Sequence, residues 1–233
     1  LQWGFLITWF ISRQTFVPSN SFESQLVILT LLASLCWILS IRKSLIFLIT
    51  FALPLICLGL VFFQLYGMEA APTELPNPWL WTHIVFAVLG DGFFFFAALI
   101  SVAYLGAEFQ LRRKLVTPLF SRLPSLVDFD RILGEALLAG FILLTLGLLL
   151  GIFFASRYWS VGWLSDVKVI FSLLSWLIYA VLLFLRALSD VYRGRRSALI
   201  SVVGFVIISF LSLMIPSKHH QTGISVEIEK TQP

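Results

Sequence analysis

The sequence predicts an all-α protein, a polytopic bundle of transmembrane helices. Of its 233 residues, 59% are hydrophobic and only 12% are charged, whereas soluble domains carry about 25% charged residues. The mean hydropathy is +0.97. Several apolar stretches reach the ~20 residues that a helix needs to cross the hydrocarbon core of a bilayer. The lipid bilayer is therefore the first partner that the sequence identifies.

Short polar loops divide these apolar stretches into an ordered set of expected helices. Residues 1–12 are apolar but too short to span, and no Met or basic segment precedes them, so we expect the tail of a truncated first helix rather than a signal peptide. We interpret residues 1–233 as a single transmembrane domain that ends in a tail, residues 216–233. Six full spans are expected, over residues 25–41, 44–66, 79–105, 132–155, 167–187 and 197–215.

The basic residues predict which side of the membrane each loop faces. Eleven Lys and Arg residues fall in three alternate loops, against four on the opposite side. Because cytoplasmic loops carry the excess of basic residues, we expect the richer side to face inward. The Trp-rich loop, residues 157–165, and the C-terminal tail then face outward. Since the pI of 9.3 is explained by these loops, nucleic acid is not an expected partner.

Two histidines and the Trp-rich loop are expected at the same outer face. His83 lies near the start of a long apolar helix, and His220, next to His219, follows the last one. Trp159 and Trp163 are four residues apart, so a helical turn would align their rings. Two imidazoles beside an aromatic shelf could ligate a flat iron macrocycle such as haem. An interfacial aromatic belt with solvated histidines would explain the same residues without a ligand.

Two acidic residues have alternative interpretations. Asp166 opens the helix after the Trp-rich loop, where a carboxylate is favoured by capping and by the helix dipole. Asp91 lies within a span, about 12 Å deeper than His83 at a rise of 1.5 Å per residue. An ionisable group at this depth suggests a proton or ion path, or a hydrogen bond to a neighbouring helix. A small transporter or channel is therefore one alternative function.

At the Trp-rich loop the chain resembles the cytochrome c assembly family, the haem-handling membrane proteins that include CcsA-, CcmC- and HemX/YpjD-like members. The family motif is WGxxWxWDPKE, and residues 159–169 read WSVGWLSDVKV. Both tryptophans, the Asp and the Lys match, while Ser165 stands where the family has a third tryptophan. Downstream, residues 175–186 (SWLIYAVLLFLR) are similar to TWLxYAxxLHxR, and residues 192–205 (YRGRRSALISVVGF) are similar to GWRGRR…GF.

The resemblance implies a protein that presents haem b at the outer face of the membrane for c-type cytochrome biogenesis. In the family, the Trp-rich loop presents haem and two outward histidines supply its axial ligands. His83 corresponds to the first and His220 to the second, with His219 as a substitute. The residues implied to hold the macrocycle are therefore His83, His220, Trp159, Trp163 and Asp166.

The resemblance also implies a location and partners. We expect a multi-pass protein of a bacterial-type inner (plasma) membrane that works with other cytochrome c maturation membrane proteins and has no catalytic turnover of its own. Phe184 stands where the downstream motif has a histidine, so no inner haem site is expected.

The main alternative is a HemX-like effector of haem synthesis, or of a partner protein, without haem of its own. The missing tryptophan favours this alternative, and the outward histidines count against it.

Overall fold

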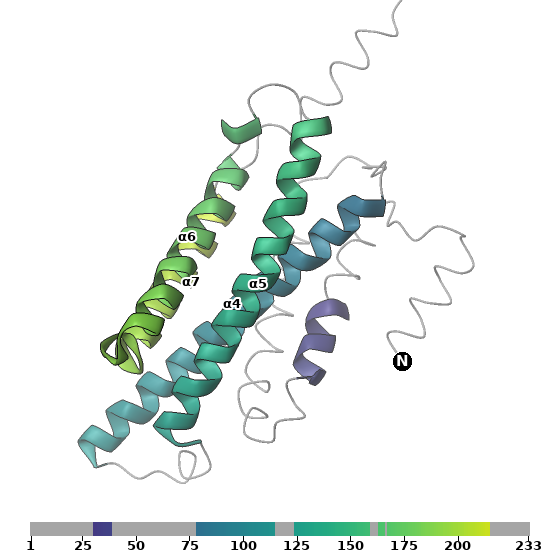
Figure 1. Cartoon of the computed structure of the whole chain (residues 1–233). Coiled ribbons are helices and arrows are strands. Elements are labelled where there is room, and N and C mark those ends of the chain that lie inside the picture. Colours follow the sequence, from purple (N-terminus) through teal and green to yellow (C-terminus); the bar gives the residue numbers. More distant parts are fainter. Residues whose placement is uncertain (1–29, 39–77, 115–123, 159–162, 166, 215–233) are drawn as a thin grey trace, which may run out of the picture.

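The structure, a computed structural model, describes residues 30–38, 78–114, 124–158, 163–165 and 167–214, and no strand occurs among them. Residues 30–38 form a helical segment, and four long helices follow (Figure 1). Two 3-10 turns, η3 (Trp163–Ser165) and η4 (Asp190–Tyr192), precede the last two helices. The long helices are α4 (Pro78–Arg113), α5 (Leu126–Tyr158), α6 (Val167–Leu188) and α7 (Arg195–Met214). The predicted all-helical class is thus confirmed.

Three helices in the described part of the chain are long and apolar enough to cross a membrane, namely Thr82–Arg113, Leu126–Arg157 and Val169–Leu188. They coincide with the spans expected over residues 79–105, 132–155 and 167–187. The first two extend further than hydropathy predicts. The Arg112–Glu108 ion pair lies in the extension of α4, and the Ser125 hydroxyl caps the start of α5 by accepting from the Asp128 N–H at 3.2 Å. Residues 44–66 and most of 25–41 lie outside the described residues, so the count of six spans stays a prediction.

Consecutive helices run antiparallel and give the bundle two ends (Figure 1). We call one the histidine end: it holds His83 at the start of α4, the end of α5, η3 and the start of α6. The opposite end is the arginine end. There the described residues include Arg112, Arg113, Lys114, Arg131, Arg186, Arg193, Arg195 and Arg196, against Arg157 and Lys168 at the histidine end. The charge asymmetry predicted from the loops therefore separates the two ends of the structure.

Glycines bring the backbones of α4 and α5 into near contact. A Cβ atom on Gly90 would lie 2.9 Å from the Leu144 backbone nitrogen, and one on Gly147 would lie 3.1 Å from the Ala87 nitrogen. Contacts between residues 83 and 151, 87 and 147, 90 and 144, and 94 and 140 follow one antiparallel register. Small residues drive helix association in lipid because they let two backbones approach within van der Waals range.

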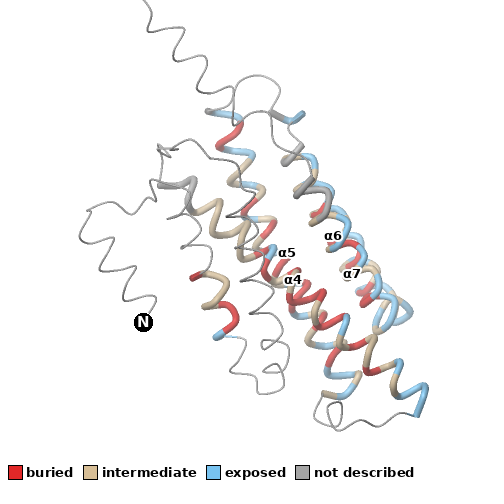
Figure 2. The backbone as a smooth tube through the Cα atoms, turned by 180° about the vertical axis from the view of Figure 1, so that it is seen from behind, coloured by how far each residue is buried: buried red, intermediate tan, exposed pale blue. Residues whose placement is uncertain are grey.

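The core lies where the four long helices meet, toward the arginine end, as the buried residues in Figure 2 show. Phe94 of α4 stacks on Tyr179 of α6, with ring centroids 3.6 Å apart and an interplanar angle of 4°. The Trp176 indole N–H donates to the Thr145 hydroxyl of α5 at 2.9 Å. The other large side chains that are fully buried in the described part of the chain are Phe129, Leu133, Leu137 and Leu182. The motif residues of α6 thus pack against the bundle.

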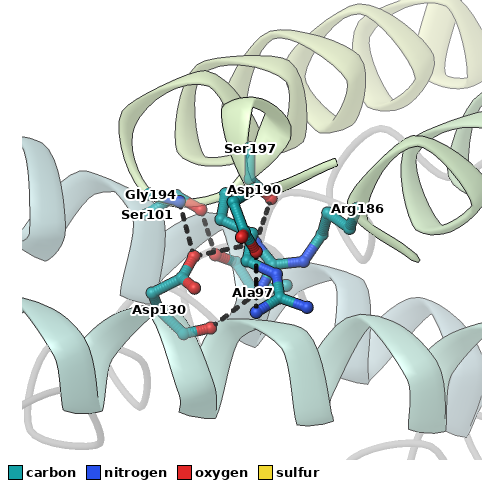
Figure 3. A network of polar contacts seen from close by, with 8 residues as sticks. Ala97, Ser101, Asp130, Arg186, Asp190, Gly194 and Ser197 are labelled. Carbon is teal, nitrogen blue, oxygen red and sulfur yellow. Dashed lines mark hydrogen bonds and ion pairs between the residues drawn. The ribbon is translucent and has the colours of Figure 1, made fainter. Parts of the chain in front are cut away.

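At the arginine end, Arg186 joins the last turns of α6 to α5 and α7 (Figure 3). Its guanidinium donates to the Asp130 carboxylate at 2.9 Å, to the Asp130 carbonyl at 3.0 Å and to the Ser197 hydroxyl at 2.6 Å. The Gly194 N–H donates to the same carboxylate at 2.7 Å. Gly194 has φ +61°, a left-handed conformation that favours glycine. A residue that the sequence marks as an orientation signal is therefore also a buried tether.

We expect Arg186→Ala to lower the free energy of unfolding by about 3 kcal/mol, since removing one partner of a buried ion pair leaves the other uncompensated. The matched control is Arg131→Ala. Arg131 pairs with Glu135 at 3.2 Å, but its side chain is 79% exposed, so the loss should stay under about 1 kcal/mol. Denaturant titration of the detergent-solubilised variants measures both values. Equal losses would show that the Arg186 network does not hold the bundle together.

Candidate functional site

His83 is directed from α4 onto the backbone of α5. It lies at the start of the first described membrane span and is half-buried. Its Nδ1 atom is 2.7 Å from the carbonyl oxygen of Gly147. A carbonyl oxygen only accepts hydrogen bonds, so the partner assigns the proton to Nδ1. In the neutral ring, the lone pair is then on Nε2.

Gly151 provides the space in which this ring lies. A Cβ atom on Gly151 would be 2.7 Å from His83 Cε1, 3.0 Å from Nδ1 and 3.5 Å from Nε2. Gly147 and Gly151 are one helical turn apart on α5, so one orients the ring and the other accommodates it. We call these two residues the glycine notch.

This arrangement gives His83 the chemistry of a metal ligand. Histidines that ligate metals usually donate their other ring N–H to a carboxylate, a backbone carbonyl or water, which fixes the tautomer and the ring orientation. The Gly147 carbonyl provides this partner here. The prediction that His83 is a candidate ligand is therefore compatible with its geometry.

The described end of the Trp-rich loop, residues 163–165, lies at the same end of the bundle. Residues 163–165 form η3 directly before α6, and Ser165 is exposed. Figure 1 shows η3 beside the start of α6, at the end of the bundle where α5 finishes. The side chain of Trp163 lies outside the described residues, as do Trp159, Asp166, His219 and His220. The pairing of His83 with His220 and the capping of α6 by Asp166 stay predictions.

Sequence reasoning missed the glycine notch, although a signal was present. Residues 147–151 read GLLLG, a small-xxx-small pattern that is typical of close helix contacts in membranes. The pattern gives no indication of the partner helix or of an imidazole in the contact.

Phe184 lies at the histidine position of the downstream motif. Its side chain is 63% exposed, whereas Tyr179 and Arg186 of the same motif are buried.

Asp91 is exposed on α4 and forms no hydrogen bond or ion pair with the part of the chain that the structure describes. The described ranges also contain no group of three or more His, Cys, Asp or Glu residues that could hold a metal ion. The structure therefore adds no support to the transporter alternative, which expects charges converging at membrane depth.

The fold and this end of the bundle together define a class, the helical integral membrane proteins with an oriented imidazole at one end. Residues 4–220 match the model of the family described as cytochrome C assembly protein. The chain therefore belongs to the cytochrome c assembly protein family. This membership confirms the resemblance drawn from the Trp-rich loop and the downstream motifs, and with the spanning helices it fits an inner-membrane protein.

Curated relatives named cytochrome c biogenesis protein CcsA support the same assignment. One from Prochlorococcus marinus (strain MIT 9215) is 37% identical over 81 residues, covering 35% of this chain and 26% of the relative. One from Synechococcus sp. (strain CC9902) is 30% identical over 167 residues, which cover 63% of this chain and 55% of the relative. One from Atropa belladonna is 27% identical over 243 residues, which cover 88% of this chain and 75% of the relative. The chain thus spans about a quarter of the length of the Prochlorococcus relative. No solved structure matches the chain.

Proposed function

We propose that the protein binds haem b at the histidine end of its bundle and presents it at the outer face of the inner membrane for c-type cytochrome biogenesis. The observation that carries this proposal is the hydrogen bond from His83 Nδ1 to the Gly147 carbonyl, 2.7 Å long. It leaves the Nε2 lone pair for iron and holds the ring in one orientation. A preoriented ligand loses less conformational freedom on binding, which favours affinity.

The other ligands are assigned from the family motif. His220, or His219 beside it, would supply the second axial nitrogen, and Trp159 and Trp163 would flank the macrocycle. Asp166 would order the Trp-rich loop by capping α6, which begins at the next residue, Val167. The chain would act by holding and presenting haem, its cargo, and not by catalytic turnover.

The orientation of the bundle follows from its charges. The arginine end would face the cytoplasm by the positive-inside rule, which places His83, η3 and the C-terminal tail on the outer side. Haem held there would be accessible to other cytochrome c maturation membrane proteins, the partners that we propose.

We expect His83→Ala to abolish the Soret absorbance of the detergent-solubilised, haemin-reconstituted protein, because an axial nitrogen is lost. Free imidazole added to this variant should restore the band, since it can occupy the space left beside Gly147 and Gly151. The measurement is Soret absorbance per mole of protein. Wild-type absorbance in His83→Ala without imidazole would refute the proposed ligand, and a haem-free wild type would favour the effector alternative.

Gly151→Ala tests the geometry of the ligand. The three atoms nearest to the added methyl group all belong to the His83 ring, so the ring must turn away. Loss of such supporting contacts typically lowers metal affinity 10–100-fold, and we expect a fall of about that size in haem affinity without loss of stability. The control is Gly204→Ala, whose methyl group would meet only the flexible Ile178 side chain, at 3.3 Å. Haem titration of both variants distinguishes a positioned ligand from a histidine that merely fills space.

Ser165→Trp restores the tryptophan of the family motif. Ser165 is exposed, so η3 can carry the larger side chain, and we expect haem occupancy to rise or stay unchanged. Trp163→Ala should weaken binding tenfold at most, because one stacking contact contributes about 0.5–1.5 kcal/mol. If Trp163→Ala proved more damaging than His83→Ala, stacking and not ligation would dominate haem retention.

A further inference from the structure

An open cavity of about 350 Å³ lies at the arginine end, between the start of α5 and the end of α6. Its lining residues carry three arginines and one aspartate, so its net charge is positive. The full set is Val127, Asp130, Arg131, Arg186, Ala187 and Arg193. None of these residues belongs to the proposed haem site.

The position of this cavity along the helices places it at the depth of lipid headgroups. The candidate span Leu126–Arg157 begins beside the cavity, and the candidate span Val169–Leu188 ends beside it. Val127 and Ala187 of the lining are apolar, and Val127 is 78% exposed, so apolar side chains lie beside the charged ones. A ligand with a charged group and a hydrocarbon part matches both features.

The arginines have N–H groups available for such a ligand. Three of the five N–H groups of Arg186 bond Asp130 and Ser197, which leaves two without a partner among the described residues. Arg131 pairs with Glu135 at 3.2 Å, and the Glu135 side chain is 41% exposed. Arg193 pairs with Asp190 at 3.2 Å, and the Asp190 side chain is 89% exposed. Exposed pairs of this kind contribute little and exchange readily. Guanidinium groups recognise phosphate oxygens by paired N–H donors.

We propose that this cavity binds the phosphate of an anionic glycerophospholipid. Arg131 and Arg193 would contact the phosphate from the two sides of the cavity, and Arg186 would contribute its unused N–H groups from the base. The acyl chains would lie along the exposed apolar residues at the cavity edge. Basic pockets between transmembrane helices are known binding places for anionic headgroups.

The test measures binding of short-chain phosphatidylglycerol to the full detergent-solubilised chain by calorimetry. The variant is the double substitution Arg131→Gln/Arg193→Gln. The matched control is Arg113→Gln/Arg196→Gln, which removes the same charge from the same end. Arg113 and Arg196 lie over the Phe109 and Tyr192 rings, outside the cavity lining. All four positions are exposed, and circular dichroism verifies that both variants fold.

We expect the cavity variant to lose about 25-fold in affinity, since each of the two basic residues near an anionic lipid contributes a factor of about five. The control should change less than twofold, and phosphatidylcholine should bind at least tenfold more weakly than phosphatidylglycerol. Equal losses in both variants would reduce the effect to general electrostatics and overturn the proposal. Equal binding of the two lipids, or of inorganic phosphate and phosphatidylglycerol, would overturn it as well.

Discussion

The close contact between α4 and α5 is the constraint on which the other described contacts depend. Gly90 and Gly147 let the two backbones approach, and a single register joins residues 83–94 of α4 to residues 140–151 of α5. At one end this register brings the His83 ring to the Gly147 carbonyl. Toward the other end, Tyr104 of α4 and Asp130 of α5 both lie against Gly194 before α7. The candidate ligand and the arginine network are therefore set by one packing arrangement.

Helix α5 takes part in three of the polar contacts between helices in the described part of the chain, which helps to hold the bundle together in lipid. In hydrocarbon, an unsatisfied polar group costs several kcal/mol, so a contact that pairs two such groups across helices stabilises that pairing. α5 provides the Gly147 carbonyl for His83, the Thr145 hydroxyl for Trp176 and the Asp130 carboxylate for Arg186. These contacts connect α5 to α4 once and to α6 twice. Polar residues on α4 and α6 thus specify neighbours that apolar residues alone would leave interchangeable.

Hydropathy was sufficient to predict the helices that the structure describes, because burial in lipid depends on local composition. It underestimates α4 and α5, whose polar ends, with the Arg112–Glu108 pair in α4 and the Ser125 cap in α5, continue the helix beyond the apolar stretch. His83 was found as a candidate ligand because a polar residue is conspicuous in an apolar stretch. The partners of His83 and Arg186 were not predictable: they lie 64 and 56 positions away in the sequence, and no local pattern encodes a contact between distant helices. Of the remaining site residues, only the backbone of Trp163 is described, while Trp159, Asp166, His219 and His220 lie outside the described part of the chain.

The nature of the His83 partner bears on the kind of haem site that the proposed function requires. A carboxylate partner would make the imidazole more basic and strengthen its bond to a metal. The Gly147 carbonyl is uncharged, so it fixes the tautomer and the direction of the ring without that added strength. The glycine notch adds steric restraint on the same ring. A ligand that is well oriented but moderate in strength suits a protein that holds haem only until a partner accepts it, whereas permanent retention would favour an anionic partner at Nδ1.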